Sequence, residues 1–167
     1  MGIVARMGER SSGRDESEGE RLDRNLGELL QELRVALPGV QVLFAFLLAV
    51  PFQQNFTKIS HFQERVYFVT LLLTALAAVL LIAPTAYHRV TFRKQQKQHL
   101  IYLANKFAIA GLACLALAMT GAIMLITDVM FSTAATIVTS AAAFLVFFLF
   151  WFALPLQRQF SLEDEPS

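Results

Sequence analysis

Charged side chains are scarce in this sequence. They make up only 16% of the 167 residues, and two long stretches contain none: Val66 to Tyr87 and Phe107 to Ile126. A soluble domain carries about a quarter charged residues, whereas hydrophobic residues reach 56% here. The composition therefore excludes an ordinary soluble domain and indicates a protein of the membrane.

Cysteine is limited to one residue, Cys114, which lies inside an apolar run. A single cysteine forms neither an internal disulfide nor a thiolate metal site, so we expect a small buried hydrophobe. The sequence also lacks the patterns of nucleophilic triads, phosphate-binding loops, dinucleotide folds and metal-spaced histidines. It therefore predicts no enzyme, no catalytic residue, no cofactor and no metal site.

Four apolar segments approach the length that a membrane-spanning helix needs, which is about 20 residues. They lie at about 33–52, 66–87, 104–126 and 133–156. The sequence thus predicts an all-α integral membrane protein whose four-span domain covers residues 21–156. A disordered cytoplasmic tail is expected at 1–20, where apolar residues are too few to offset the entropy of ordering, and a short cytoplasmic tail at 157–167.

An amphipathic helix is predicted immediately before the first span. Leucines recur there at spacings of three and four residues, which places them on one helical face. They are Leu22, Leu26, Leu29, Leu30 and Leu33. We expect this helix to run on into the first span. Between the third and fourth spans the connection is short, so these two should form a tight antiparallel hairpin.

Small side chains follow one face of the third span, with Leu115 as the single interruption. They are Ala104, Ala108, Gly111, Ala118 and Ala122, and Thr70, Thr74 and Ala78 recur similarly in the second span. Small residues let helices approach closely, so we predict close packing of the spans on one another or on a second copy. The threonines can bond back to their own helix and need no ligand.

Basic residues gather on one side of the predicted spans. Of the 14 Lys and Arg residues, only Lys58 and Arg65 fall in the opposite connections. Such a bias marks the cytoplasmic side, so both termini should lie in the cytoplasm. The connection between spans two and three also offers contacts to anionic lipid headgroups, worth about 1 kcal/mol each. The candidates are Arg89, Arg93, Lys94 and Lys97. This connection has no groove-reading element, so no nucleic-acid partner is expected.

A polar cluster is predicted at the cytoplasmic level. Glu28 and Glu32 are four residues apart and share a helical face, from which they can pair with Arg89 or Lys106. The alternative is an exposed acidic face or a simple packing ion pair. The candidate members are Glu28, Glu32, Arg34, Gln41, His88, Arg89, Asn105 and Lys106.

Two polar residues, Gln41 of this cluster and Asp128, lie within or near the spans. Gln41 is the deepest strong hydrogen-bonding side chain, and we expect its amide to hold helices together rather than to bind a transported ligand. Asp128 is a candidate outer carboxylate at the end of the third span, where it can stay hydrated; a proton relay is the less favoured role.

The stretches NLGELLQELRVALPGVQVLFAFLLAVPF, YFVTLLLTALAAVLLIAPTAYHR and WFALPL resemble an uncharacterised family of small four-helix membrane proteins, a domain of unknown function in bacteria, chiefly actinobacteria. The likeness covers about residues 23–156. It implies a multi-pass protein of the bacterial cytoplasmic membrane, and some relatives carry a sodium/proton antiporter label. It supplies no functional residues.

Two functions follow as hypotheses. The first is a non-enzymatic accessory or interaction protein, whose partners are the lipid bilayer, anionic headgroups and either a second copy or another membrane protein. The alternative is a small oligomeric proton or cation transporter. Secondary antiporters usually contain repeats and carboxylates near the midplane, which this sequence lacks. A hydrated path past Gln41, His88 or Asp128 would favour transport, whereas a dry bundle packed by Leu and Ala would favour the first hypothesis.

Overall fold

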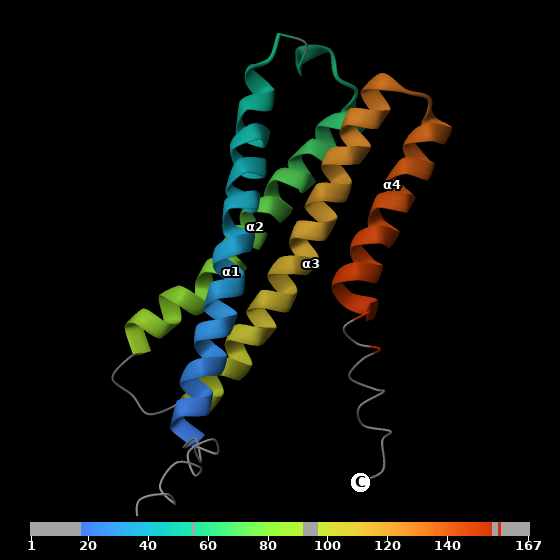
Figure 1. The fold of residues 1–167 in the computed structure, drawn as a ribbon. Helices are drawn as coiled ribbons and strands as arrows, with labels where there is room; N and C mark the ends of the chain where they lie inside the picture. Colours follow the sequence, from blue (N-terminus) through green and yellow to red (C-terminus); the bar gives the residue numbers. More distant parts are fainter. Residues whose placement is uncertain (1–17, 55, 92–96, 155–156, 158–167) are drawn as a thin grey trace, which may run out of the picture.

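Four long helices build the protein in the computed structural model, which describes residues 18–54, 56–91, 97–154 and 157. They are α1 (Glu18–Ala49), α2 (His61–Thr91), α3 (Lys97–Met130) and α4 (Thr133–Phe148). The short 3₁₀ helices η1 (Val50–Phe52) and η2 (Phe56–Lys58) connect α1 to α2, and the π-helix η3 (Leu149–Ala153) continues α4. Successive long helices run in opposite directions (Figure 1).

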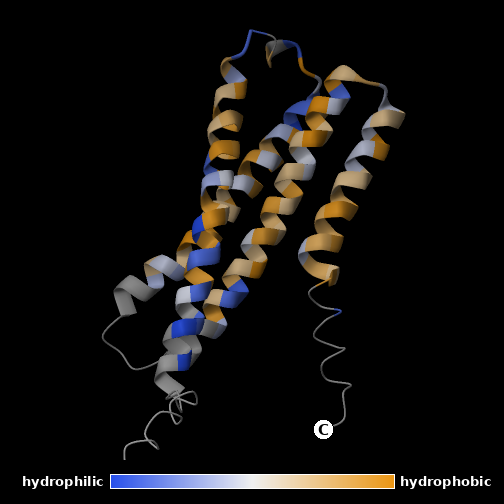
Figure 2. Ribbon diagram, viewed as in Figure 1, coloured by the Kyte–Doolittle hydropathy of each residue, from blue (hydrophilic) through white to orange (hydrophobic). Residues whose placement is uncertain are grey.

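Each long helix contributes a segment that is long and apolar enough to cross a membrane. The four segments are Gly27–Phe52, His61–Tyr87, Tyr102–Met130 and Thr133–Ala153. Hydrophobic residues dominate their ribbons (Figure 2), and many large apolar side chains stay exposed, such as Phe46 at 70% and Val138 at 68%. Exposed apolar surface of this extent suits contact with lipid. The predicted all-helical fold with four potential spans is confirmed.

The predicted amphipathic helix and the first span form one continuous helix. α1 runs for 32 residues and contains Pro38 without ending there. Leu33 is only 4% exposed, and Leu29 and Leu30 pack against the same core. The leucine stripe therefore extends the apolar contact beyond the first span. The side chains of Leu22 and Leu26 lie outside those that the structure describes.

A capping box sets the start of α2. The Ser60 backbone N–H donates to Gln63 Oε1 at 3.0 Å, and the Gln63 N–H donates to Ser60 Oγ at 3.2 Å. This reciprocal pair satisfies two N–H groups that a helix start otherwise leaves without partners. α2 consequently begins at His61, ahead of the apolar run that starts at Val66. Pro84 lies inside α2, and the last turns after it bend away from the bundle (Figure 1).

The core lies among α1, α2 and α3, and the longest contact is the one between α2 and α3. A Cβ atom on Gly111 would lie 2.8 Å from Leu81 Cγ, and one on Gly121 would collide with Thr70 Oγ1. The helices come this close because neither glycine carries a side chain. Ala104 and Ala118 of α3 and Thr70 and Thr74 of α2 are also buried. The close approach that the small residues predict is therefore present.

α4 packs against α3 and is otherwise largely exposed. Only Phe131 and Ser132 separate α3 from α4, which confirms the tight hairpin. α4 lies beside α3, on the side away from α1 (Figure 1). Within α4 only Thr136 is buried, while Trp151 of η3 reaches the edge of the core. Most of the surface of α4 is thus free to face lipid or a partner.

Candidate functional site

The polar candidates at the end of the bundle where α1 and α3 begin make local contacts. Arg24 Nε lies 3.8 Å from Glu28 Oε1, an exposed pair within one helix. Lys106 Nζ lies 4.4 Å from the centre of the Tyr102 ring, also within one helix. Contacts of this kind between exposed groups contribute little to stability, typically less than about 1 kcal/mol. The remaining described candidates at this end are Glu32, Arg34 and Asn105, and all three are exposed.

The predicted cluster is only partly within the described structure. Among the described side chains, neither Glu28 nor Glu32 forms an ion pair with Lys106. The side chains of His88, Arg89 and Lys97, and all of Arg93 and Lys94, lie outside the described part. Pairing of an N-terminal glutamate with Arg89, and the headgroup contacts of the basic connection, therefore stay predictions.

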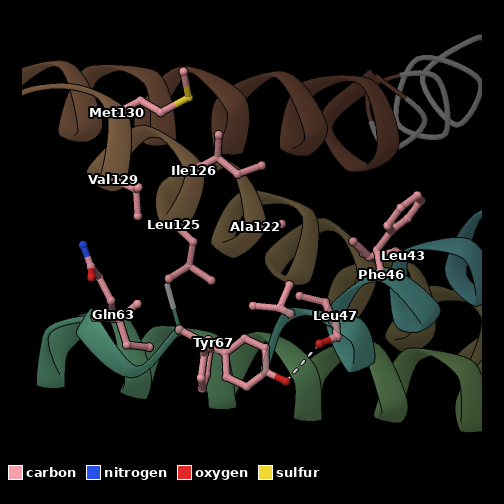
Figure 3. A pocket seen from close by; sticks show the side chains of 13 residues that line it. Leu43, Phe46, Leu47, Gln63, Tyr67, Ala122, Leu125, Ile126, Val129 and Met130 are labelled. Atoms are coloured by element: carbon pink, nitrogen blue, oxygen red, sulfur yellow. Dashed lines mark hydrogen bonds between the residues drawn. The ribbon is translucent and has the colours of Figure 1, made fainter. Parts of the chain in front are cut away.

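A partly open groove lies at the opposite end of the bundle, where α1, α2 and α3 meet η1 and η2 (Figure 3). Its volume is about 390 Å³. The lining side chains are almost all apolar: Leu43, Phe46, Leu47, Val50, Phe56, Ile59, Gln63, Tyr67, Ala122, Leu125, Ile126, Val129 and Met130. We call this surface the outer groove. Its size and lining suit a hydrocarbon chain better than an ion.

Tyr67 anchors α2 to α1 beneath the outer groove. Its hydroxyl donates a hydrogen bond of 2.9 Å to the carbonyl oxygen of Leu47, and the side chain is buried (Figure 3). The rings of Tyr67 and Phe56 form a T-shaped pair, with centroids 5.2 Å apart and planes at 75°. Because the hydroxyl is already bonded, Tyr67 presents mainly its apolar ring to the groove.

Gln63 joins α2 to α3 at one end of the outer groove. Its Nε2 donates a hydrogen bond of 2.9 Å to Asp128 Oδ2, and this contact is partly buried. The Oε1 of the same amide accepts the Ser60 N–H of the capping box. One side chain therefore starts α2 and also holds the last turn of α3. The predicted outer carboxylate, Asp128, has a structural partner in Gln63.

The sequence interpretation missed Gln63 and Tyr67. The Ser60-x-x-Gln63 spacing is a helix-start signal that could have identified the cap. Nothing local in the sequence links Gln63 to Asp128, because 65 residues separate them. The Tyr67 contact is likewise a consequence of how α1 and α2 pack.

Gln41 lies outside the outer groove, and several threonines bond within their own helices. Gln41 is exposed on α1 and does not line the outer groove. Thr74, Thr120 and Thr127 each donate a 2.8 Å hydrogen bond to a carbonyl of their own helix, as predicted. No group of three His, Cys, Asp or Glu side chains in the described part could hold a metal ion. Cys114 is half-buried.

Comparison with known proteins places the chain in a family. Searches among curated proteins and solved structures found no match. A sequence model whose description is a family of unknown function, DUF6328, matches residues 15–155. This match includes all four potential spans, the outer groove and Gln41. The chain therefore belongs to the DUF6328 family.

Proposed function

We propose that this protein is a non-enzymatic accessory or interaction protein of the bacterial cytoplasmic membrane. The observation that carries the proposal is the apolar interior of the bundle. Leu81 and Ala77 of α2 and Ala118 of α3 are fully buried, and the buried polar residues of the described part are three threonines. An ion crossing the membrane needs polar or charged groups at depth. An interior packed in this way does not suit the passage of an ion, so it supports an interaction role rather than transport.

The surfaces offered by the two ends differ in chemistry. The N-terminal end of α1 exposes charges of both signs on Arg21, Glu28, Glu32 and Arg34. On the proposal this end and both termini lie in the cytoplasm, where the basic connection between α2 and α3 contacts anionic headgroups. The outer groove at the opposite end offers an apolar surface. Both surfaces suit binding partners.

A proton or cation transporter is the second candidate function. The half-buried position of Asp128 is the observation that favours it. Its carboxylate is half-buried beside the outer groove. A carboxylate that binds a transported ion is usually found near the midplane, where it can be reached in turn from both sides. Asp128 instead lies near the end of α3, where Gln63 already donates to it. The geometry supports this candidate less than the first.

Ion flux in liposomes separates the two candidates. We expect full-length protein to give no proton or sodium flux above empty liposomes under an imposed gradient of either ion. Liposomes with an added ionophore show that the assay would detect flux. Flux by the wild-type protein that Asp128→Asn abolishes, while circular dichroism shows the same helix content, would favour transport and end the accessory proposal.

A further inference from the structure

We propose that two copies of this chain form a dimer through one face of α1, with the two Gln41 side chains hydrogen-bonded to each other. This inference rests on the proposed interaction function and names its partner as a second copy. It begins from the position of Gln41, halfway along the apolar run from Val35 to Val50. That position puts the amide near the middle of the bilayer.

Gln41 has no partner within the described chain. The residue is exposed, and none of the hydrogen bonds among the described residues reaches its side chain. The Gln amide has two N–H donors and a carbonyl acceptor, and lipid chains can bond to none of them. An amide at this depth therefore favours association with another polar group. Because the described residues supply none, the proposal takes the partner from a second molecule.

The surface around Gln41 can admit a second helix. Pro38, Gln41, Ala45 and Leu48 follow one another at spacings of three and four residues, and all four are exposed. We call them the Gln41 stripe. Ala45 is small and lies one turn from Gln41, so a neighbouring backbone can come close there. At about 100° per residue, the groove-lining Leu43 lies on the opposite side of α1. The stripe and the outer groove are thus separate surfaces.

Symmetry favours a second copy over an unrelated partner. All copies of one chain insert in the same direction, so a two-fold axis along the bilayer normal brings identical residues together at the same depth. Gln41 then meets Gln41 of the other copy. Each amide can donate from Nε2 and accept at Oε1, so the pair is self-complementary. A different membrane protein would need its own polar group at this depth.

Disulfide cross-linking in lipid vesicles tests the geometry. Ala45→Cys, in a Cys114→Ala background, keeps Gln41 and places a thiol on the stripe. Gly39→Cys is the matched control, because Gly39 is only two residues from Gln41, on the other side of the exposed arc, and a Cβ there would meet nothing within 4 Å. We expect oxidation to yield a covalent dimer from Ala45→Cys and little from Gly39→Cys. Equal yields would indicate random collision and overturn the proposal.

Substitution of the amide tests the chemistry. Energy transfer between labelled copies, measured as lipid is added, gives a dimer Kd. We expect Gln41→Leu to raise this Kd about three- to thirty-fold, the range of hydrogen bonds between membrane helices, and Gln41→Asn to restore much of the loss. Ala45→Phe should weaken the dimer independently by blocking close approach. A wild-type monomer, or a dimer that Gln41→Leu leaves unchanged, would refute the proposal.

The same samples separate this inference from the function on which it rests. A monomeric protein that carries no ions would refute the Gln41 dimer and leave the accessory function, with a different partner. A protein that carries protons or sodium in the liposome assay would overturn the accessory function, whether or not it dimerises. Circular dichroism of each variant confirms that the helices are intact.

Discussion

The hydroxyl of Tyr67 donates its hydrogen bond to the carbonyl of Leu47, the group to which residue 51 would donate in an uninterrupted helix. Residue 51 is Pro51, which has no N–H to give. The α-helix ends at Ala49, and η1 follows. A proline at the end of α1 thus leaves an acceptor that a tyrosine from α2 satisfies, and this contact fixes the floor of the outer groove.

Removal of the Tyr67 hydroxyl should therefore destabilise the protein. We expect Tyr67→Phe to lower the free energy of unfolding by about 1 to 3 kcal/mol, because the ring still packs while a buried carbonyl loses its donor. Chemical denaturation in detergent micelles measures this change. Pro51→Ala restores a backbone N–H, so Tyr67→Phe should cost less in that background. Equal costs in both backgrounds would contradict the link between Pro51 and Tyr67.

Gln63 should be more important for stability than its partner Asp128. Gln63→Ala removes both the capping contact and the bond to α3, so we expect a loss of about 1 to 2 kcal/mol in the same assay. Asp128→Asn keeps an oxygen acceptor for Gln63 Nε2 and should cost less. Ser60→Ala removes the hydroxyl side of the cap and serves as the control. A double-mutant cycle between Gln63 and Asp128 that shows no coupling would argue against the bridge.

Sequence alone predicted the elements of this fold better than their long-range contacts. The helices follow from apolar runs and leucine spacing, which are local properties. The small residues of α3 predicted close packing of the spans, and α3 packs closely on α2. The Gln63–Asp128 and Tyr67–Leu47 bonds depend instead on how α1, α2 and α3 are placed together, which no local pattern encodes. The partner of Gln41 could not be predicted from the sequence either. Its amide was expected to hold helices together, but it has no partner within the described chain.

The close approach of α2 and α3 predicts opposite effects for two glycines. Gly111→Ala brings a methyl group to within 2.8 Å of Leu81, which must shift inside a packed core. We expect a loss of about 1 to 3 kcal/mol in the free energy of unfolding. Gly39→Ala is the control, because its Cβ meets nothing within 4 Å and alanine favours a helix more than glycine does. A similar effect from both substitutions would contradict the packing role of Gly111.

The distribution of basic residues predicts which end of the bundle faces the cytoplasm. Of the 14 Lys and Arg residues, only Lys58 of η2 and Arg65, near the start of α2, belong to the end that carries η1 and η2, and the sequence predicts the other 12 on the opposite side. Since Lys and Arg in short connections are retained in the cytoplasm, the η1 and η2 end should be outside. Gln54 at that end is exposed.

Single cysteines at Gln54 and at Gln96, in a Cys114→Ala background, test this orientation with a membrane-impermeant thiol reagent. We expect Gln54→Cys to react in intact cells and Gln96→Cys to react only after the membrane is opened. Labelling of both positions from the same side would rule out a helix crossing between them, and labelling of Gln96→Cys alone in intact cells would reverse the orientation.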